Sequence, residues 1–308
     1  MNKNDKIYVA GHRGMVGSAI VRKLEKQGYK NIITRKHSEL DLTNQIDTQQ
    51  FFEKEQPDYV FIAAARVGGI LANSEYPAEF IYDNIMIQSN LIHNSTCSGV
   101  KKLLFLGSSC IYPKFAKQPI KESELMNGYL EPTNDAYATA KIAGIKMCQS
   151  YNKQYNTKFI SLMPTNLFGP NDNYDLKTSH VFPALIRKIH EAKINNSPNV
   201  EVWGSGKPLR EFLHVDDVAD SCVFLMQNYD DSEIINIGTG EDVTINELVG
   251  AMKKVIGYEG DIIYDSSKPD GTLRKLLDVS KLHNLGWKHK YSLEEGIKMT
   301  YESYLKTI

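Results

Sequence analysis

Short apolar runs alternate with longer segments of helical spacing through the first half of the chain, and this alternation limits the accessible folds more than any other feature. The strand-like runs occupy residues 6–10, 31–34, 59–64, 102–107 and 159–163, and the helical segments occupy residues 15–27, 46–55, 77–98 and 136–155. A strand-helix-strand order indicates a parallel sheet with helices on both faces and right-handed crossovers. Ligands of such sheets bind beyond the carboxyl ends of the strands, so the residues there are the first candidates for function.

The second half of the chain is less regular than the first. Residues 169–180 are polar and loop-like, and a short strand-like run at residues 199–203 ends in a glycine turn. We therefore expect a Rossmann-type doubly wound α/β domain over residues 1–169 and a smaller α/β substrate lobe over residues 170–308. Part of the segment at about 212–243 is expected to return to the first domain.

Composition excludes several classes of protein. Among the 308 residues, 36 are Lys or Arg and 37 are Asp or Glu, so the formal net charge is −1 and no basic surface for nucleic acid or an anionic membrane is expected. The first residues lack the apolar segment of a secretory signal, and no apolar run approaches the roughly 20 residues of a membrane helix, so we expect a cytoplasmic protein. The four cysteines form no C-x-x-C pair, so neither a disulfide framework nor a metal site is expected.

Three glycines follow the first strand directly and precede the first helical segment. Gly11, Gly14 and Gly17 have the spacing G-x-x-G-x-x-G. Glycines at this turn let a diphosphate approach backbone N–H groups, and the helix N-terminus attracts its negative charge. A purely structural turn is the alternative, but the strand-turn-helix context favours a dinucleotide site.

The end of the second strand indicates which dinucleotide binds. Enzymes that use NAD usually place Asp or Glu there to bind the ribose 2′-hydroxyl, whereas this chain has Thr34, Arg35 and Lys36. A guanidinium can bind a 2′-phosphate in a bidentate fork. We therefore expect NADP(H), held by Arg35 with Arg13 as a second clamp. The alternative is that Arg35 and Lys36 are solvated surface charges.

A serine, a tyrosine and a lysine form the second motif. Ser108 follows the fourth strand, and Tyr137 and Lys141 lie four residues apart on one face of a helical segment. An ammonium near the phenol should lower its pKa, and such a phenol can pass a proton to a carbonyl that accepts a hydride. The serine hydroxyl would give that oxygen a second hydrogen bond. A Tyr-x-x-x-Lys pair is common by chance, but here it accompanies the strand-end serine and the glycine loop.

These motifs resemble the extended short-chain dehydrogenase/reductase family of nucleotide-sugar enzymes over essentially the whole chain. Longer stretches are similar to the branch that acts on GDP-linked 4-keto-6-deoxyhexoses: residues 63–70, 107–114, 164–170, 203–206, 210–217 and 267–271. The resemblance implies a bifunctional enzyme that epimerises GDP-4-keto-6-deoxy-D-mannose at C3 and C5 and reduces C4 with NADPH. It also implies a homodimer formed through the helices at about 77–98 and 136–155.

Within that resemblance, Cys110 and His180 match the family's positions for the acid-base chemistry of epimerisation. A thiolate is a good base near neutral pH, and an imidazole titrates in the useful range. Cys110 follows Ser108 closely and is expected to face the same sugar. The alternatives are an inert buried cysteine and an exposed loop histidine.

The resemblance also implies the residues that contact the ligands. Trp203 would stack on the guanine, Arg210 would bind the diphosphate and Asp270 would bind hydroxyl groups; the alternative for Trp203 is simple core filling. Lys188 stands where relatives often have an Arg on the nucleotide, and Arg66 stands where Lys is usual. The implied sets are, for the cofactor, Gly11, Arg13, Gly14, Met15, Val16, Gly17, Arg35, Asp41, Leu42, Ala64, Tyr137, Lys141, Pro164, Asn166, Leu167 and His180, and, for the substrate, Ser109, Asn166, Lys188, Trp203, Arg210 and Asp270.

Two other functions are weighed against this one. Another epimerase or a dehydratase of the same family would recycle a tightly held NAD and would carry an acid pair or a Thr beside the strand-four serine, where this chain has Ser109 and Cys110. A non-catalytic NADP-binding protein would have lost part of the Ser-Tyr-Lys set, all of which is present. Asp216, by contrast, is interpreted as a structural helix cap.

Overall fold

The central sheet confirms the doubly wound α/β prediction. The computed structural model describes residues 1–268 and 270–308. Parallel strands lie in the order β10-β5-β4-β3-β1-β2. β1, β4 and β5 are buried along their whole length, as expected of strands covered on both faces. The bounds are β1 (Ile7–Ala10), β2 (Ile32–Ile33), β3 (Tyr59–Ile62), β4 (Lys102–Leu106), β5 (Phe159–Pro164) and β10 (Ile235–Ile237).

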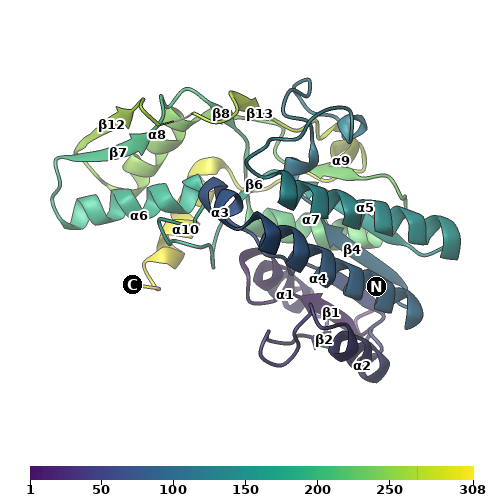
Figure 1. Cartoon of the computed structure of the whole chain (residues 1–308). Coiled ribbons are helices and arrows are strands. Elements are labelled where there is room, and N and C mark those ends of the chain that lie inside the picture. The colour runs from purple at the N-terminus through teal and green to yellow at the C-terminus, as the bar shows by residue number, and fades with distance from the viewer. Residues whose placement is uncertain (269) are drawn as a thin grey trace.

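Helices cover both faces of the sheet (Figure 1). α2, α4 and α5 pack on one face and α1 and α7 on the other. Their apolar residues recur at helical spacing and point at the strands; in α1 these are Ala19, Ile20 and Leu24. The four helices predicted in the first half agree with the structure within one residue at each end. The bounds are α1 (Met15–Lys26), α2 (Gln45–Glu55), α4 (Pro77–Cys97), α5 (Asp135–Tyr155) and α7 (Val215–Asn228).

The strand order reverses beside β1, and this reversal positions the ligand site. β2 pairs with one edge of β1 and β3 with the other, so a crevice opens at the carboxyl ends of β1 and β3. The segment after β3 lies against the glycine loop there, because the Ala63 N–H donates to the Ala10 carbonyl at 3.0 Å. The fold therefore places Gly11 at the edge where the sequence predicted a ligand.

The elements outside this sheet and its helices form a second lobe beside it (Figure 1). Its core lies among α6, α8, α10 and the parallel pair β7-β12, and Phe168 and Phe182 stack there with ring centroids 4.0 Å apart. Two small sheets, β11-β8-β13 and β6-β9, lie where the chain passes between the two parts. The bounds are β6 (Asn166–Phe168), α6 (Val181–Ile194), β7 (Asn199–Trp203), β8 (Leu209–Arg210), β9 (Phe212–His214), β11 (Val243–Thr244), α8 (Ile245–Ile256), β12 (Asp261–Asp265), β13 (Arg274–Lys275) and α10 (Leu293–Tyr304).

The chain returns to the first part after β9. α7 shares a buried apolar cluster with α1, and β10 extends the central sheet beside β5. The N-cap residue of α7 is His214, whose Nδ1 accepts a hydrogen bond from the Asp216 N–H at 3.3 Å. The predicted cap at Asp216 is therefore wrong: Asp216 is already inside the helix, and its carboxylate pairs with Arg22 of α1 at 2.7 Å.

A buried carboxylate joins the segments at this boundary. Glu211, between β8 and β9, is completely buried and accepts the backbone N–H groups of Gly240 at 2.8 Å and Leu277 at 3.1 Å. Burial raises the pKa of this carboxyl, and the hydrogen bonds oppose the rise. Glu211 thus fixes β8 relative to the segment that follows β13.

The shorter helices are α3 (Ile70–Glu75) and α9 (Ser280–Asn284). Within residues 1–268 and 270–308, no helix is both long and apolar enough to span a bilayer.

Candidate active site

Backbone atoms shape the dinucleotide site after β1. Gly11 has a φ of +83°, and a Cβ there would lie 2.6 Å from the Ala64 nitrogen. A Cβ at Gly17 would overlap the Gly11 carbonyl. Gly14 is the N-cap of α1 and provides no capping side chain, so the first N–H groups of the helix remain available to bind an anion. This cradle fits the diphosphate of a dinucleotide, in agreement with the sequence prediction.

Arg35 is placed at the end of β2, as predicted, but it is not a freely solvated charge. Its Nη1 donates to the Thr34 carbonyl at 2.8 Å, and its Nη2 pairs with Glu55 of α2. The guanidinium also lies 5.4 Å from the centre of the Phe51 ring. One third of the side chain is exposed, so a phosphate could reach it in competition with Glu55. Arg13, in the glycine loop, is exposed to solvent.

The Ser-Tyr-Lys set lies at the carboxyl end of β4. Lys141 is buried on α5, and its ammonium donates to the carbonyl of Leu106, the last residue of β4, at 2.8 Å. The ammonium lies 5.8 Å from the centre of the Tyr137 ring, as the four-residue spacing predicts. Ser108 follows β4, and Phe80 of α4 packs edge-on against the Tyr137 ring. The three side chains therefore meet at the ligand edge of the sheet.

The predicted lowering of the Tyr137 pKa is wrong for this structure. Burial raises the pKa of the phenol, a nearby charge on Cys110 raises it further, and the Ser108 hydroxyl lowers it. Burial also lowers the pKa of Lys141 to about 7, so the lysine is only partly charged near neutral pH. Desolvation is therefore the largest cause of both pKa shifts. A phenol with a raised pKa keeps its proton at neutral pH and can donate it.

Cys110 is neither fully buried nor remote from charge. It lies in the short helix η1 (Ser109–Ile111), where its N–H donates to the Ser108 hydroxyl at 3.2 Å. The ammonium of Lys275, from β13, lies 3.6 Å from its sulfur. His180 precedes α6 and is accessible from the solvent, yet the protein around it reduces its hydration and lowers its pKa; the charge of Lys275 lowers it further. Lys275 therefore lies near both residues of the predicted epimerase pair.

Sequence reasoning missed Lys275. The chain has 36 Lys and Arg residues, so one lysine in an irregular segment gives no signal by itself. Its only sequence clue is its position shortly after the motif at 267–271, and that clue does not show which side chain it faces. The contact with Cys110 depends on the pairing of two short strands far apart in the sequence, and no local pattern predicts it.

Trp203 is an exposed residue and not core filler. It ends β7, and 59% of its surface is exposed. The ammonium groups of Lys188, from α6, and Lys268 each lie 5.5 Å from the centre of its ring. An exposed indole with two cations beside it fits a flat base that has phosphates attached. The predicted guanine site thus retains its aromatic surface and the Lys188 charge.

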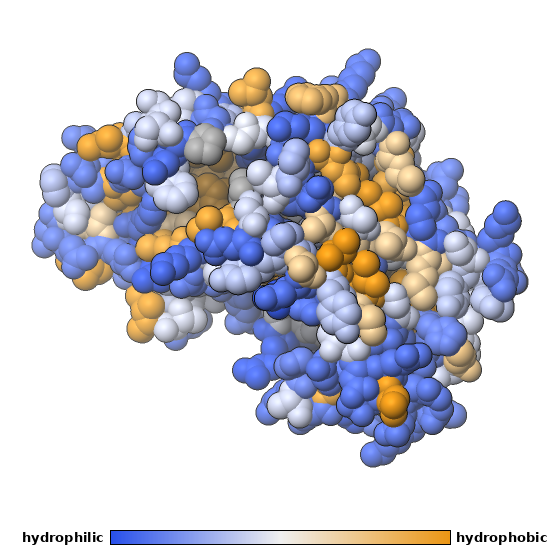
Figure 2. Space-filling model, viewed as in Figure 1, coloured by the Kyte–Doolittle hydropathy of each residue, from blue (hydrophilic) through white to orange (hydrophobic). Residues whose placement is uncertain are grey.

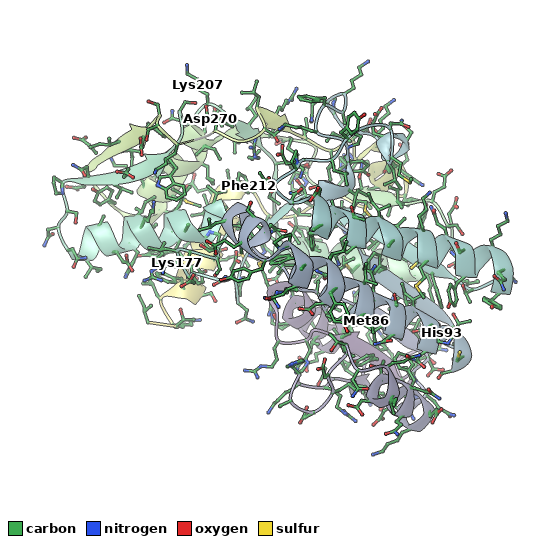
Figure 3. The ribbon with its side chains drawn as sticks, viewed as in Figure 1. Met86, His93, Lys177, Lys207, Phe212 and Asp270 are labelled. Atoms are coloured by element: carbon green, nitrogen blue, oxygen red, sulfur yellow. The ribbon has the colours of Figure 1, made fainter. Side chains whose placement is uncertain are left out.

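Asp270 and Arg210 lie close to this indole in the fold but already have partners. Asp270 accepts the Ser205 N–H at 2.6 Å and its hydroxyl at 2.8 Å, so it holds the glycine turn after β7. The hydrogen bonds from Ser205 lower the pKa of Asp270, and partial desolvation opposes them. Lys207, which lies beside Asp270 in Figure 3, lowers this pKa further by its charge. Arg210 donates to the Leu209 carbonyl at 2.8 Å, and burial lowers its pKa. Pro269 of the same motif lies outside the described residues.

The other predicted contacts lie where the chain enters or leaves the sheet. Asp41 accepts the Thr43 N–H at 2.9 Å, and the Asn90 side chain donates to the Leu42 carbonyl at 2.9 Å. Asn166 donates to the Glu211 carbonyl at 2.9 Å. Ser109 is buried, Pro164 ends β5, Leu167 lies in β6, and Met15 and Val16 begin α1. These residues surround the ligand edge of the sheet but provide no reactive group beyond those named above.

Comparisons with known proteins agree with this geometry. The model of the NAD-dependent epimerase/dehydratase family matches residues 7–238. GDP-L-fucose synthase 1 of Arabidopsis thaliana is 60% identical over 307 residues, which is 100% of this chain and 95% of that protein. The crystal structure of a GDP-6-OMe-4-keto-L-xylo-heptose reductase from C. jejuni has a TM-score of 0.95 and 43% identity, and covers 100% of this chain and 99% of its own. The crystal structure of a GDP-L-fucose synthetase from Naegleria fowleri bound to NADP has a TM-score of 0.93 and 31% identity, with 100% and 96% covered.

The family match includes the whole central sheet, from β1 to β10, together with the glycine loop and the Ser-Tyr-Lys set. The identity to the plant relative extends beyond it through the second lobe. The resemblance seen in the sequence is thereby confirmed, and the chain belongs to the NAD-dependent epimerase/dehydratase family, in the branch of the GDP-L-fucose synthases.

Proposed function

We propose that this protein converts GDP-4-keto-6-deoxy-D-mannose to GDP-L-fucose, by epimerisation at C3 and C5 and reduction of C4 with NADPH. The observation that carries the proposal is the position of Cys110, close to both Ser108 and Tyr137 at the end of β4 and beside Lys275. One bound ketone can therefore meet the groups for both reactions. The full-length plant relative named GDP-L-fucose synthase 1 supports the substrate, and the NADP-bound relative supports the cofactor.

Epimerisation uses the acidity that the C4 ketone gives to its neighbouring C–H bonds. The thiolate of Cys110 takes a proton from C3 or C5, and the C–H electron pair moves into the carbonyl to give an enolate. Ser108 and Tyr137 hydrogen-bond the enolate oxygen. His180, as the imidazolium, then donates a proton to the opposite face of the carbon.

Reduction uses the buried set on α5. NADPH supplies a hydride to C4 when it is bound. Tyr137 donates its proton to the C4 oxygen as that oxygen gains negative charge, Ser108 positions the oxygen, and Lys141 supports the Tyr137 ring from the same helix face. The glycine cradle would hold the cofactor's diphosphate, and Arg35 with Arg13 would hold its 2′-phosphate.

The nucleotide of the substrate is assigned to the second lobe. Trp203 would stack on the guanine, while Lys188 and Arg210 would pair with the diphosphate. Asp270 would accept hydroxyl groups in exchange for part of its bonding to Ser205. This arrangement leaves the sugar at the end of the diphosphate, directed toward Cys110 and Tyr137.

The proposal is tested by incubating the protein with GDP-4-keto-6-deoxy-D-mannose and NADPH in heavy water. We expect one NADPH to be oxidised for each GDP-L-fucose formed, measured by NADPH absorbance, with deuterium at C3 and C5 of the product, measured by mass spectrometry and NMR. NADPH oxidation with no deuterium at either carbon would contradict the epimerase part, and the absence of NADPH oxidation would contradict the whole assignment.

A second candidate function is reduction without epimerisation. The related C. jejuni structure is a reductase of a GDP-linked 4-keto-heptose, so a chain of this fold can act on a GDP-keto sugar as a reductase. The cluster of Cys110, His180 and Lys275 favours the bifunctional reading, because the reduction alone needs none of the three. The deuterium measurement separates the two candidates.

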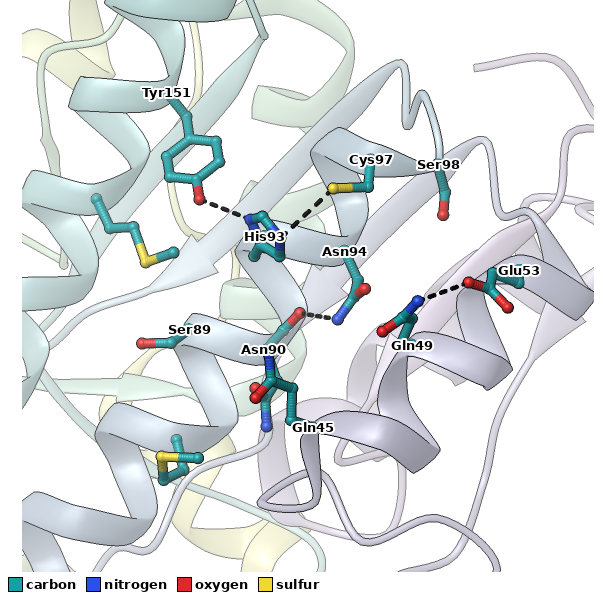
Figure 4. A pocket seen from close by; sticks show the side chains of 12 residues that line it. Gln45, Gln49, Glu53, Ser89, Asn90, His93, Asn94, Cys97, Ser98 and Tyr151 are labelled. Carbon is teal, nitrogen blue, oxygen red and sulfur yellow. Dashed lines mark hydrogen bonds between the residues drawn. The ribbon is translucent and has the colours of Figure 1, made fainter.

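We further propose that the protein forms a homodimer through the outer face of α4 and α5. Apolar side chains gather over these helices in Figure 2, and Met86 and His93 lie along the outer side of α4 in Figure 3. A groove of about 490 Å³ runs between α2, α4 and α5. Figure 4 shows His93 in this groove, 2.9 Å from the Tyr151 hydroxyl and 3.6 Å from the Cys97 sulfur. The groove contains none of the catalytic candidates, which suits a surface that meets a second copy.

The dimer is tested at Met86, which lines this groove. A Met86→Glu variant places a charge on the proposed interface and should sediment as a monomer where the wild type sediments as a dimer. Lys26→Glu, at the exposed end of α1 on the opposite face of the sheet, provides the control for a charge change outside the interface. A wild type that sediments as a monomer would contradict the proposal.

A further inference from the structure

We propose that Lys275 is a positioning residue for epimerisation: its ammonium holds the sulfur of Cys110, the group that removes the sugar proton, and it has no part in the reduction. This inference rests on the proposed function. Lys275 lies 3.6 Å from the Cys110 sulfur, although the two residues are 165 positions apart in the chain. A positive charge next to a sulfur is the usual way in which proteins activate a cysteine.

The charge of Lys275 is directed at the sulfur and not neutralised by a carboxylate. Among residues 1–268 and 270–308, no Asp or Glu oxygen lies within ion-pair distance of its ammonium. The adjacent Arg274 differs, since its guanidinium pairs with Asp242 at 2.6 Å. The two neighbouring cations of β13 therefore have different partners. Arg274 forms an ion pair with Asp242, and Lys275 contacts the sulfur of Cys110.

The backbone around Lys275 is fixed on both sides. The Leu276 N–H donates to the Gln118 side-chain oxygen at 2.8 Å, and the Gln118 side-chain nitrogen donates to the Arg274 carbonyl at 3.2 Å. Lys275 itself pairs with Arg210 in the parallel register of β13 and β8. These contacts fix the backbone from which the Lys275 side chain reaches the sulfur.

The other titratable groups around Cys110 do not replace Lys275. Burial raises the pKa of the Tyr137 phenol on α5, a charge on the nearby Cys110 raises it further, and the phenol keeps its proton at neutral pH. His180 precedes α6; desolvation lowers its pKa, and the charge of Lys275 lowers it further. Lys275 is thus the cation that lies near both residues of the pair and contacts the sulfur of Cys110.

The competing explanation is that Lys275 binds the substrate diphosphate, because it pairs in register with Arg210. The two roles differ in what they change. A diphosphate ligand would alter the KM for the GDP-sugar in both reactions. A positioning residue for Cys110 would alter the reactivity of the thiol without any substrate, and would slow only the proton exchange.

The first test measures the thiol directly. In a Cys97→Ser background the buried Cys148 and Cys222 leave Cys110 as the accessible cysteine. We expect iodoacetamide to modify Cys110 at least tenfold more slowly at neutral pH in Lys275→Met than in the parent, roughly the effect of removing a close opposite charge. Lys275→Arg, which keeps the charge, should recover most of the rate, and Arg274→Gln should match the parent. If Lys275→Met does not fold, Lys275→Gln replaces it.

The second test follows the two reactions in the same variants. Lys275→Met should slow deuterium exchange at C3 and C5 at least tenfold at neutral pH, while reduction of a ketone already epimerised stays within about twofold. Unchanged alkylation by iodoacetamide would overturn the inference. So would an equal rise in KM for exchange and reduction, which would assign Lys275 to the diphosphate. A wild type that alkylates as expected but neither exchanges nor reduces the sugar would contradict the proposed function and not the contact.

Discussion

The reductase set and the epimerase set lie side by side but are built differently. Ser108, Tyr137 and Lys141 belong to one strand end and one helix, and the buried ammonium bonds directly to the carbonyl that ends β4. Cys110, His180 and Lys275 come instead from a short helix, the loop before α6 and a two-residue strand. Local helical geometry fixes the first set, whereas the second exists only when three distant segments of the chain are packed together.

This difference shows where sequence spacing is informative about chemistry. A four-residue interval on a helix implies that two side chains share a face, whatever the rest of the protein does. No interval relates Cys110 to Lys275, since their contact depends on β13 pairing with β8 and on Gln118 holding the strand. The two sets should therefore respond separately to substitution.

The largest difference between the effects on reduction and on proton exchange is expected for Tyr137→Phe. Loss of the proton donor should reduce the rate of NADPH oxidation by about 1000-fold, because positioned proton donors contribute on this scale. Deuterium exchange at C3 and C5 should persist within about threefold, since Cys110 and His180 are unchanged. Single-turnover reduction and mass spectrometry of recovered substrate measure the two effects. An equal fall in both would mean that the sets are not separate.

The converse change is Cys110→Ala. Exchange should fall by about 100-fold or more because the base is missing, whereas reduction of a ketone already epimerised should remain near the wild-type rate. Cys97→Ser, an exposed cysteine on α4, provides the matched control and should change neither reaction. If Cys110→Ala exchanges normally, the sulfur is not the base.

Arg35→Ala tests whether a change in cofactor binding affects the reduction and leaves the proton exchange intact. The KM for NADPH should rise roughly 50-fold and that for NADH should hardly change, because only NADPH has the 2′-phosphate that a guanidinium binds. Exchange at C3 and C5 should be unaffected at saturating cofactor. Lys36→Ala controls for general surface charge; equal effects of the two substitutions, or equal effects on both cofactors, would remove the assignment of Arg35.

The smallest effect concerns stability, and it tests the burial of the reductase set. The pKa of Lys141 is lowered from 10.5 to about 7 in the folded protein, so between these values the unfolded chain binds more protons than the native one. The free energy of unfolding should consequently rise with pH in this window, by about 2 kcal/mol from neutral pH to about pH 9. Below pH 7 the cost of charging the buried amine is fully present.

Urea unfolding of wild type and Lys141→Met across this window measures that contribution. The variant should lack this part of the rise, so the wild type gains on it as the pH increases. Lys146→Met, an exposed lysine on the same helix, should keep the wild-type slope. Parallel curves for wild type and Lys141→Met would show that Lys141 is solvated in solution.

Much of the fold was accessible from the sequence, because apolar periodicity fixes long elements. The strands around the glycine loop and the helices α1, α2, α4 and α5 lie where predicted. The two-residue strands β8, β11 and β13 have no period to detect and were not predicted. The sequence did not show how deeply Tyr137 and Lys141 are buried. Burial raises the pKa of Tyr137, where a lower value was expected, and leaves Lys141 only partly charged. The residue types of the site could be read, but their protonation required the packing.

The position of β10 at the edge of the central sheet has a consequence for synthesis of the chain. β5 ends at Pro164, but its outer neighbour spans Ile235–Ile237, and the helix that covers the α1 side, α7, lies between them in sequence. A nascent chain that has emerged only to residue 169 therefore has an unpaired strand edge and an uncovered apolar face, both of which promote aggregation. The domain with the central sheet therefore cannot finish folding on the ribosome until β10 has been made. The second-lobe segments between β5 and α7 are made before then, so the two parts must fold during the same period.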